Sequence, residues 1–276
     1  MKVAFWESVR HECKQMSSMA AISIMLSINF GKRVVLLDNG QDSNSLERIF
    51  TGIQRFYYVK EDSNYVLRHV GMDNILQNIS DKSNLQPLLE QSAVEVIKDY
   101  LYYVPQSKVV NRFAYEYVLS YELNKIIESY DQLVDYTIIR ARGGNNMSTK
   151  QVIDMADMVM VELSQNYGQL DEFFDHYASI RKHAIYVFND YKANSISIYQ
   201  IMERYRIKKE QVIVISEHMP LKAACLGGGL VDYIRSNTNC SSESENYRCV
   251  RELKRAAKII IRKERSRWGA TNSEID

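Results

Sequence analysis

The sequence has few of the residues that break a chain or cross-link it. Three prolines and eleven glycines in 276 residues argue against long structureless linkers. The four cysteines form no C-x-x-C pair, which favours a reducing cytosol over a disulfide framework or a zinc site. No apolar run approaches the roughly eighteen residues of a membrane span, and the run at the N-terminus is too short for a signal peptide. We therefore expect a folded, cytoplasmic protein.

The sequence also lacks an excess of charge of either sign. Lys and Arg total 35 and Asp and Glu total 34, so the formal net charge of +1 gives no general attraction to nucleic acid or to an anionic surface. Apolar residues make up 46% of the chain and charged residues 25%, the balance of a globular protein that buries a core. The length is sufficient for one large α/β domain.

Short apolar runs of strand length alternate with helical segments along the chain. The predicted strands cover residues 2–6, 34–37, 100–104, 134–139, 158–161, 184–188 and 211–215. The predicted helices cover residues 16–30, 46–50, 72–79, 87–97, 112–130, 152–156, 170–180, 196–205, a segment from 221 to the glycines at 227–229, and 244–265. This alternation predicts an α/β fold, a single doubly wound and mainly parallel sheet with helices on both faces. We assign residues 1–242 to this domain and residues 243–276 to a basic amphipathic helix and tail packed on it.

Two of the predicted helices have informative apolar patterns. The helix over 16–30 is apolar on all sides, which predicts burial between two layers. The helix over 112–130 carries spaced apolar residues, among them Phe113, Tyr117 and Leu119, and we interpret these as one core-facing side.

The first forty residues form a unit of strand, loop, helix and strand that ends on Asp38. Such a unit is typical of nucleotide-binding α/β proteins. A phosphate-binding loop needs glycines, so that successive backbone N–H groups can turn toward the anion, and a lysine for the phosphates. Residues 7–18 contain no glycine. The architecture is therefore that of a nucleotide-binding protein, whereas the loop chemistry is altered.

The order of these segments resembles the ParA/MinD family of P-loop ATPases with a deviant Walker A motif, over nearly the whole chain. In that family the loop after the first strand reads K-G-G-x-G-K-T-T. On this sequence His11 stands at the position of the signature lysine, and Met16 at that of the phosphate lysine. The glycine positions hold Glu12, Cys13 and Gln15, and the threonine positions hold Ser17 and Ser18. Asp38 keeps the first acid of the family's D-x-D motif, whereas Gly40 replaces the second, and Arg140 replaces the Walker B acid. Asn189 matches the family's adenine-facing asparagine.

The resemblance implies a residual cofactor site for ATP with Mg²⁺, made by Ser17, Ser18, Asp38 and Asn189. The N–H groups at a helix start can hold a phosphate without a lysine. The alternative is structural, with the two serines capping the helix and the other two residues serving as loop polar groups. We expect no catalytic residue and no metal site made by the protein alone, because His11-Glu12-Cys13 are adjacent in sequence and have no partner pair downstream.

The altered motif positions predict the loss of ATP hydrolysis. A missing phosphate lysine, missing glycines and a cation at the Walker B position each remove a part of phosphoryl-transfer catalysis. Within the family the chain looks most like the degenerate members of Flp/Tad pilus systems, the TadZ/CpaE type. This resemblance implies a positioning or scaffold factor for a pilus or secretion apparatus, acting as a homodimer with protein partners. The enzyme alternative is an active ATPase switch for plasmid or chromosome partition or for placing cell division.

The last predicted helix carries a cluster of basic residues. Eight Lys and Arg residues lie between Arg251 and Arg267, against two glutamates, and Trp268 follows. A basic amphipathic helix of this kind could bind an anionic membrane or DNA, which makes a binding module through Arg251–Trp268 a third hypothesis. The structural alternative is a helix that closes the domain with its apolar side, leaving its charges solvated.

Overall fold

The protein is described here by a computed structural model, which defines residues 1–7, 14–39, 46–52, 70–80, 84–107, 111–141, 143, 146–182 and 184–267. Within these residues eight strands form one sheet in the order β3-β4-β2-β5-β1-β6-β7-β8. The strands are β1 (Lys2–Glu7), β2 (Val34–Asp38), β3 (Val94–Ile97), β4 (Leu101–Val104), β5 (Tyr136–Ala141), β6 (Met158–Leu163), β7 (Ala184–Tyr191) and β8 (Val212–Ser216). β3 is antiparallel to β4, and the other neighbouring pairs are parallel. The predicted doubly wound, mainly parallel sheet is confirmed.

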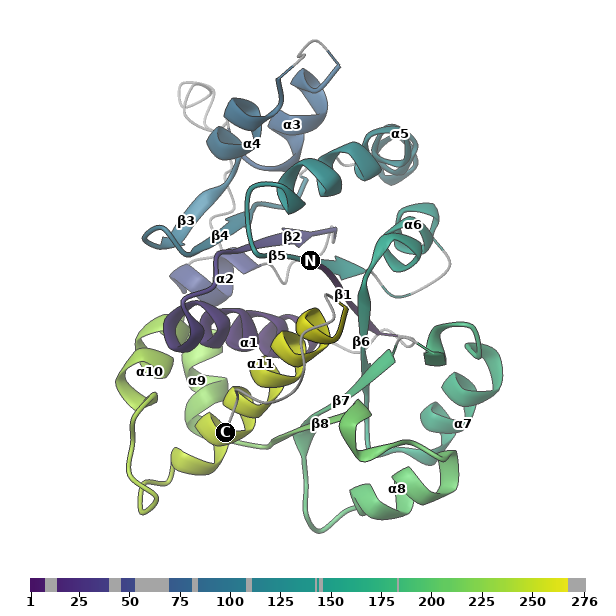
Figure 1. Ribbon diagram of the computed structural model, residues 1–276, viewed down its shortest axis with the longest axis vertical. Helices are drawn as coiled ribbons and strands as arrows, with labels where there is room; N and C mark the ends of the chain where they lie inside the picture. The colour runs from purple at the N-terminus through teal and green to yellow at the C-terminus, as the bar shows by residue number, and fades with distance from the viewer. Residues whose placement is uncertain are drawn as a thin grey trace.

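Helices cover both faces of this sheet (Figure 1). One face carries α1 (Lys14–Phe30), α2 (Leu46–Thr51), α9 (Met219–Gly227), α10 (Leu230–Asn237) and α11 (Tyr247–Arg267). The other face carries α3 (Met72–Asn78), α4 (Gln86–Ser92), α5 (Arg112–Asp131), α6 (Met147–Met155), α7 (Tyr167–His176) and α8 (Ile198–Tyr205), with short 3-10 turns at Ile180–Lys182 and Lys209–Gln211. In the part of the chain that the structure describes, no helix is both long and apolar enough to cross a membrane.

The alternation of side chains along each strand divides the interior into two cores. In β1, Val3 and Phe5 face the α1 side, whereas Ala4 and Trp6 face the α5 side. All four are at most 2% exposed. Because both faces of the central strands are covered, these strands are almost uniformly apolar, as expected for a buried parallel sheet.

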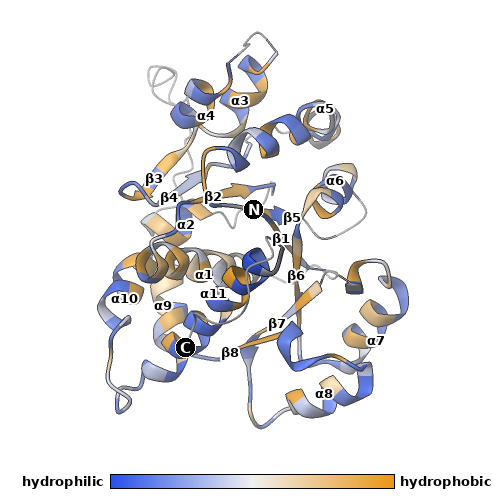
Figure 2. Cartoon of the chain, in the orientation of Figure 1, coloured by the Kyte–Doolittle hydropathy of each residue, from blue (hydrophilic) through white to orange (hydrophobic). Residues whose placement is uncertain are grey.

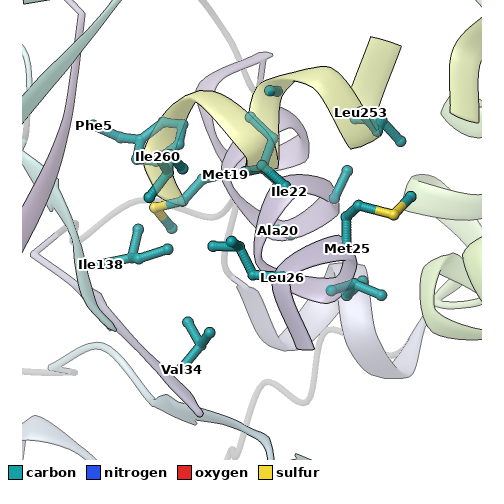
Figure 3. Close-up of a cluster of buried hydrophobic side chains, with 14 of the residues drawn as sticks. Phe5, Met19, Ala20, Ile22, Met25, Leu26, Val34, Ile138, Leu253 and Ile260 are labelled. Atoms are coloured by element: carbon teal, nitrogen blue, oxygen red, sulfur yellow. The ribbon is translucent and has the colours of Figure 1, made fainter. Parts of the chain in front are cut away.

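The helix α1 lies between the sheet and α11. Its residues from Ser18 to Ser27 are all buried, which confirms the prediction that this helix is enclosed on all sides. Figure 3 shows Met19, Ile22 and Met25 of α1 in one apolar cluster with side chains of α11 and of the strands. The sheet side of α1 and its outer side are therefore both core.

The helix α11 supplies the outer layer over α1. Its apolar side, which includes Leu253, Ala257 and Ile260, is fully buried. Leu253 and Ile260 lie against the α1 cluster in Figure 3, and the hydropathy colouring of Figure 2 shows hydrophilic and hydrophobic residues mixed along α11. The structural alternative for this segment, a helix that closes the domain with its apolar stripe, is the arrangement observed.

Two predictions for the other face are wrong in part. The helix expected over 87–97 ends at Ser92, and Val94–Ile97 forms the edge strand β3. Ser92 Oγ donates to the carbonyl of Leu88, and Ala93 then takes an extended conformation that ends the helix. On α5, Phe113 and Tyr117 do not face the core, because they are 89% and 66% exposed.

The glycines at 227–229 end α9, as predicted, and also make a close contact with α2. Gly228 has φ of 76° and caps α9, and the helix α10, which was not predicted, begins two residues later. A Cβ on Gly228 would lie 1.8 Å from the amide nitrogen of Gly52. Gly52 also has a positive φ, of 68°. The two backbones touch at a point where neither residue can carry a side chain.

We predict that Gly228→Ala lowers the free energy of unfolding by about 3 kcal/mol or more, because it combines a left-handed backbone with a steric clash. The matched control is Gly227→Ala, where a Cβ meets nothing within 4 Å and the residue is helical. The control should change stability by less than about 1 kcal/mol. Urea unfolding of both variants checks this, and equal effects would contradict the tight contact.

Candidate functional site

The four residues predicted to bind a cofactor lie where parallel α/β sheets usually bind ligands, at the carboxyl ends of the strands. Asp38 is the last residue of β2, and Asn189 lies near the end of β7. Ser17 and Ser18 lie in α1, which begins at Lys14, so they are inside the helix and do not occupy its cap position. His11, Glu12, Cys13, Gly40 and Trp268 lie outside the described residues.

The central feature of this edge is a buried ion pair between Asp38 and Arg140. The two residues are direct neighbours on the parallel strands β2 and β5. Arg140 Nη1 lies 3.2 Å from Asp38 Oδ1, and the two side chains are 12% and 2% exposed. At such burial the carboxylate and the guanidinium neutralise each other with little screening by solvent. The acid at the end of β2 is therefore paired with the cation at the end of β5.

Two buried carboxylates, which the sequence reasoning missed, lie further along the same edge. Glu7 ends β1 and Glu162 lies beside it on β6. Their exposed fractions are 9% and 7%. Ser18 Oγ donates to Glu162 Oε2 at 3.5 Å, a long hydrogen bond that places these carboxylates beside the first turns of α1. The signal in the sequence was an acidic residue directly after each apolar run.

Ser17 faces a different neighbour, the thiol of Cys225 on α9. Burial raises the pKa of Cys225 to about 11, and a hydrogen bond from Ser17 opposes this rise. The sulfur is therefore a protonated, inert thiol at neutral pH, and the Ser17 hydroxyl joins α1 to α9.

Asn189 belongs to a polar turn at the end of β7. Its Oδ1 accepts a hydrogen bond from the amide of Asp190, a residue with a left-handed φ of 54°. Lys222 Nζ then lies 3.2 Å from Asp190 and 2.9 Å from Glu217. The hydrogen bond from Lys222 holds the pKa of Glu217 below its usual value. Local partners thus hold the loops around the predicted adenine position.

The described residues do not fit a magnesium-bound triphosphate. Arg140 places a positive charge at the position where the resemblance puts the Walker B acid. Glu7 and Glu162 place two buried carboxyl groups near the start of α1, where phosphates would bind to helix N–H groups. Among the described residues, no cluster of His, Cys, Asp or Glu side chains is arranged to hold a metal ion.

The fold itself is that of the ParA/MinD type of P-loop ATPase. A ParA family ATPase from Chlorobium tepidum TLS superposes with a TM-score of 0.69 at 13% identity, covering 93% of this chain and 98% of its own. A chain of the MinC:MinD cell division protein complex from Aquifex aeolicus gives 0.67 at 13% identity, covering 100% and 99%. A putative plasmid partition protein from Borrelia burgdorferi B31, bound to AMPPNP, gives 0.63 at 15% identity, covering 95% and 99%.

These similarities are of structure, and at such low identities they establish the fold alone. No protein-family model matches the sequence, and no curated protein matches it either. The agreement extends over nearly the full length of each solved chain, so the fold prediction made from the resemblance is confirmed.

We predict that breaking the Asp38–Arg140 pair is strongly destabilising. Asp38→Asn or Arg140→Gln should each lower the free energy of unfolding by about 3–5 kcal/mol, because a buried charge loses its partner. The matched control is the exposed pair of Asp232 and Arg235, whose side chains are 85% and 58% exposed. Asp232→Asn or Arg235→Gln should cost less than about 1 kcal/mol.

The double variant Asp38→Asn with Arg140→Gln tests whether the two residues stabilise each other or contribute to stability independently. If the ion pair is the cause, the double variant should lose clearly less than the sum of the two single losses. Urea unfolding measures all four states of this cycle. Additive losses would contradict the assignment of the pair as a mutually stabilising unit.

Proposed function

We propose that this protein is a catalytically degenerate ParA/MinD-like protein that acts as a positioning or scaffold factor. The observation that supports this most directly is the buried Asp38–Arg140 ion pair at the carboxyl edge of the sheet. A guanidinium at the Walker B position repels a divalent cation and occupies the carboxylate beside it. Binding and hydrolysis of ATP with Mg²⁺ both depend on a free acid near the metal.

The process that the protein serves is part of the same proposal. Three features are shared in kind with degenerate members of Flp/Tad pilus systems. They are the glycine-free loop, Met16 at the phosphate-lysine position and Arg140 at the Walker B position. On this basis we assign the protein to the placement of a pilus or secretion apparatus. Self-association as a homodimer and contact with protein partners would carry that role, and the solved MinC:MinD complex illustrates the contact with a protein partner for a chain of this fold.

ATP hydrolysis by the purified full-length chain tests the proposal. We expect no magnesium-dependent hydrolysis above that of the Asp38→Ala variant, and no heat of binding when ATP and Mg²⁺ are titrated to millimolar concentration. The reason is the cation of Arg140 beside Asp38. Magnesium-dependent hydrolysis that disappears in an Asp38→Ala protein shown to be folded by circular dichroism would overturn the proposal and favour the alternative, an active switch for partition or for placing cell division.

A second candidate function, binding to a polyanion, rests on the outer side of α11. The apolar side of this helix is buried against α1, so it is not free to enter a membrane. The outward side nevertheless carries exposed basic residues: Arg251, Arg255, Arg262, Lys263 and Arg265. Cations held on a rigid helix can contact phosphates without any apolar insertion. This arrangement favours a surface contact with DNA or anionic lipid headgroups.

Charge reversal on α11 tests this second candidate better than truncation, which would uncover the core. Arg255→Glu with Arg262→Glu should weaken co-sedimentation with double-stranded DNA or anionic vesicles by about tenfold or more, because each lost phosphate contact also reduces counterion release. Arg206→Glu with Lys209→Glu, exposed cations elsewhere, is the control. Equal binding by all three proteins would remove this candidate.

A further inference from the structure

A row of exposed aromatic side chains follows the outer side of α5. Phe113, Tyr117 and Tyr121 lie four residues apart and are 89%, 66% and 69% exposed. The opposite side of the helix is core, with Leu119 and Leu123 buried. In Figure 1, α5 lies outside the sheet, on the same face as α3, α4 and α6. The helix is thus apolar on two sides, and within the described chain only the inner side faces a core.

The exposed apolar surface extends beyond these three aromatic side chains. Val118 is 43% exposed beside it, and Met147, the first residue of α6, is 68% exposed. The backbone amide of Ser148 donates to Glu116 Oε2, which holds the start of α6 against α5. We call Phe113, Tyr117, Val118, Tyr121 and Met147 the α5 patch. Aromatic residues and Met, which make up four of its five members, are enriched in protein interfaces, and the half-buried Glu116 lies between α5 and Met147.

Two tyrosines of the patch contact each other. The rings of Tyr117 and Tyr121 meet edge to face with centroids 5.1 Å apart, and their hydroxyl oxygens are 3.4 Å apart. Aromatic side chains have few rotatable bonds, so less conformational entropy is lost when they are buried at a contact. A prearranged pair of this kind lowers the cost of docking.

The area of the patch limits what can cover it. Aromatic side chains carry about 150–250 Å² each, so the three rings expose about 450 Å², in the range of functional patches on monomers. This is less than the roughly 800 Å² per partner of a standard-size interface, so a contact limited to the patch is weak with any partner. A two-fold contact that buries the patch on both copies, with Val118 and Met147 included, covers about 1,000 Å² in total, the lower limit for a specific contact.

We propose that the α5 patch is a two-fold contact through which two copies of this chain associate weakly, helix α5 against helix α5. The four-residue spacing forms a straight seam along one side of a helix, and such a seam packs against a helix of the same spacing. The second copy supplies that helix with the same uncharged rings. This proposal rests on the self-association included in the proposed function, to which it assigns a surface.

Sedimentation velocity of the full-length chain over a range of concentrations tests the contact. The wild type should form a dimer with a dissociation constant in the micromolar range. Tyr117→Ser with Tyr121→Ser should raise that constant by about tenfold or more, because central tyrosines dominate interface energies. Tyr199→Ser, on α8 and 75% exposed, is the matched control and should dimerise as the wild type does. Circular dichroism melting of each variant verifies that the fold is retained.

A photo-crosslinking amino acid at Val118 identifies the partner surface directly. Crosslinked dimers should map to residues 111–131 of the second copy, whereas the same group at Tyr199 should give none. A wild type that stays monomeric at high concentration would overturn the proposal in favour of a helix from another protein. A dimer unaffected by the two tyrosine substitutions would place self-association elsewhere. Because ATP hydrolysis is assayed separately, its detection would overturn the loss of ATPase activity and leave the α5 result standing.

Discussion

The enclosure of α1 between the sheet and α11 is the constraint on which the rest of the structure depends. Residues Ser18 to Ser27 are buried on every side of the helix, so α1 has no surface that tolerates a polar side chain without a partner. Ser23 illustrates this, because its hydroxyl donates to the carbonyl of Met19 within the same helix. Once α1 is fixed in this way, its first turns have only one position relative to the strand ends.

That fixed position explains the character of the candidate site. The start of α1 faces Glu162 through Ser18 and faces α9 through Ser17 and Cys225. Neighbouring strands then place Arg140 against Asp38 at the same edge. The fold of a P-loop protein is retained, while the cation at the Walker B position pairs with Asp38 within the protein. Because a fold does not fix a function, the altered side chains at this edge bear on the activity more than the fold does.

Much of the fold was predictable because long apolar patterns determine it. The enclosed helix α1 was predicted correctly from its apolar pattern, and of the two alternatives left open for the last helix, the structure has its apolar side buried against the domain. The segment over 87–97 was not, because its apolar residues fit a helical period although Val94 and Val96 favour a strand. Pairing with β4 decides between the two readings, and that pairing is not visible in the local sequence. On α5, Phe113 and Tyr117 were assigned to the core with Leu119 because all three are apolar residues at helical spacing, but the two aromatic side chains lie on the opposite side of the helix.

The site was predictable only as far as single positions. Matching the motif identified Asp38 and Arg140, but they are 102 positions apart in sequence, so their ion pair required the register of β2 against β5. Glu7 and Glu162 needed the register of β1 against β6 in the same way. Which side chains meet at the edge of a sheet depends on the order of its strands. A single sequence reveals that order only through a resemblance to a known fold.

The proposed loss of nucleotide chemistry and the α5 patch have a common physical consequence. A switch protein changes its association state when a ligand binds one state more tightly than another. If the protein binds no nucleotide, as proposed, it has no such ligand, and its association then depends on concentration alone. A weak two-fold contact suits this situation, because local accumulation at one place in the cell raises the dimer fraction without any chemical step. Placing that contact on α5, away from α11, leaves the basic outer side of α11 free for a different partner.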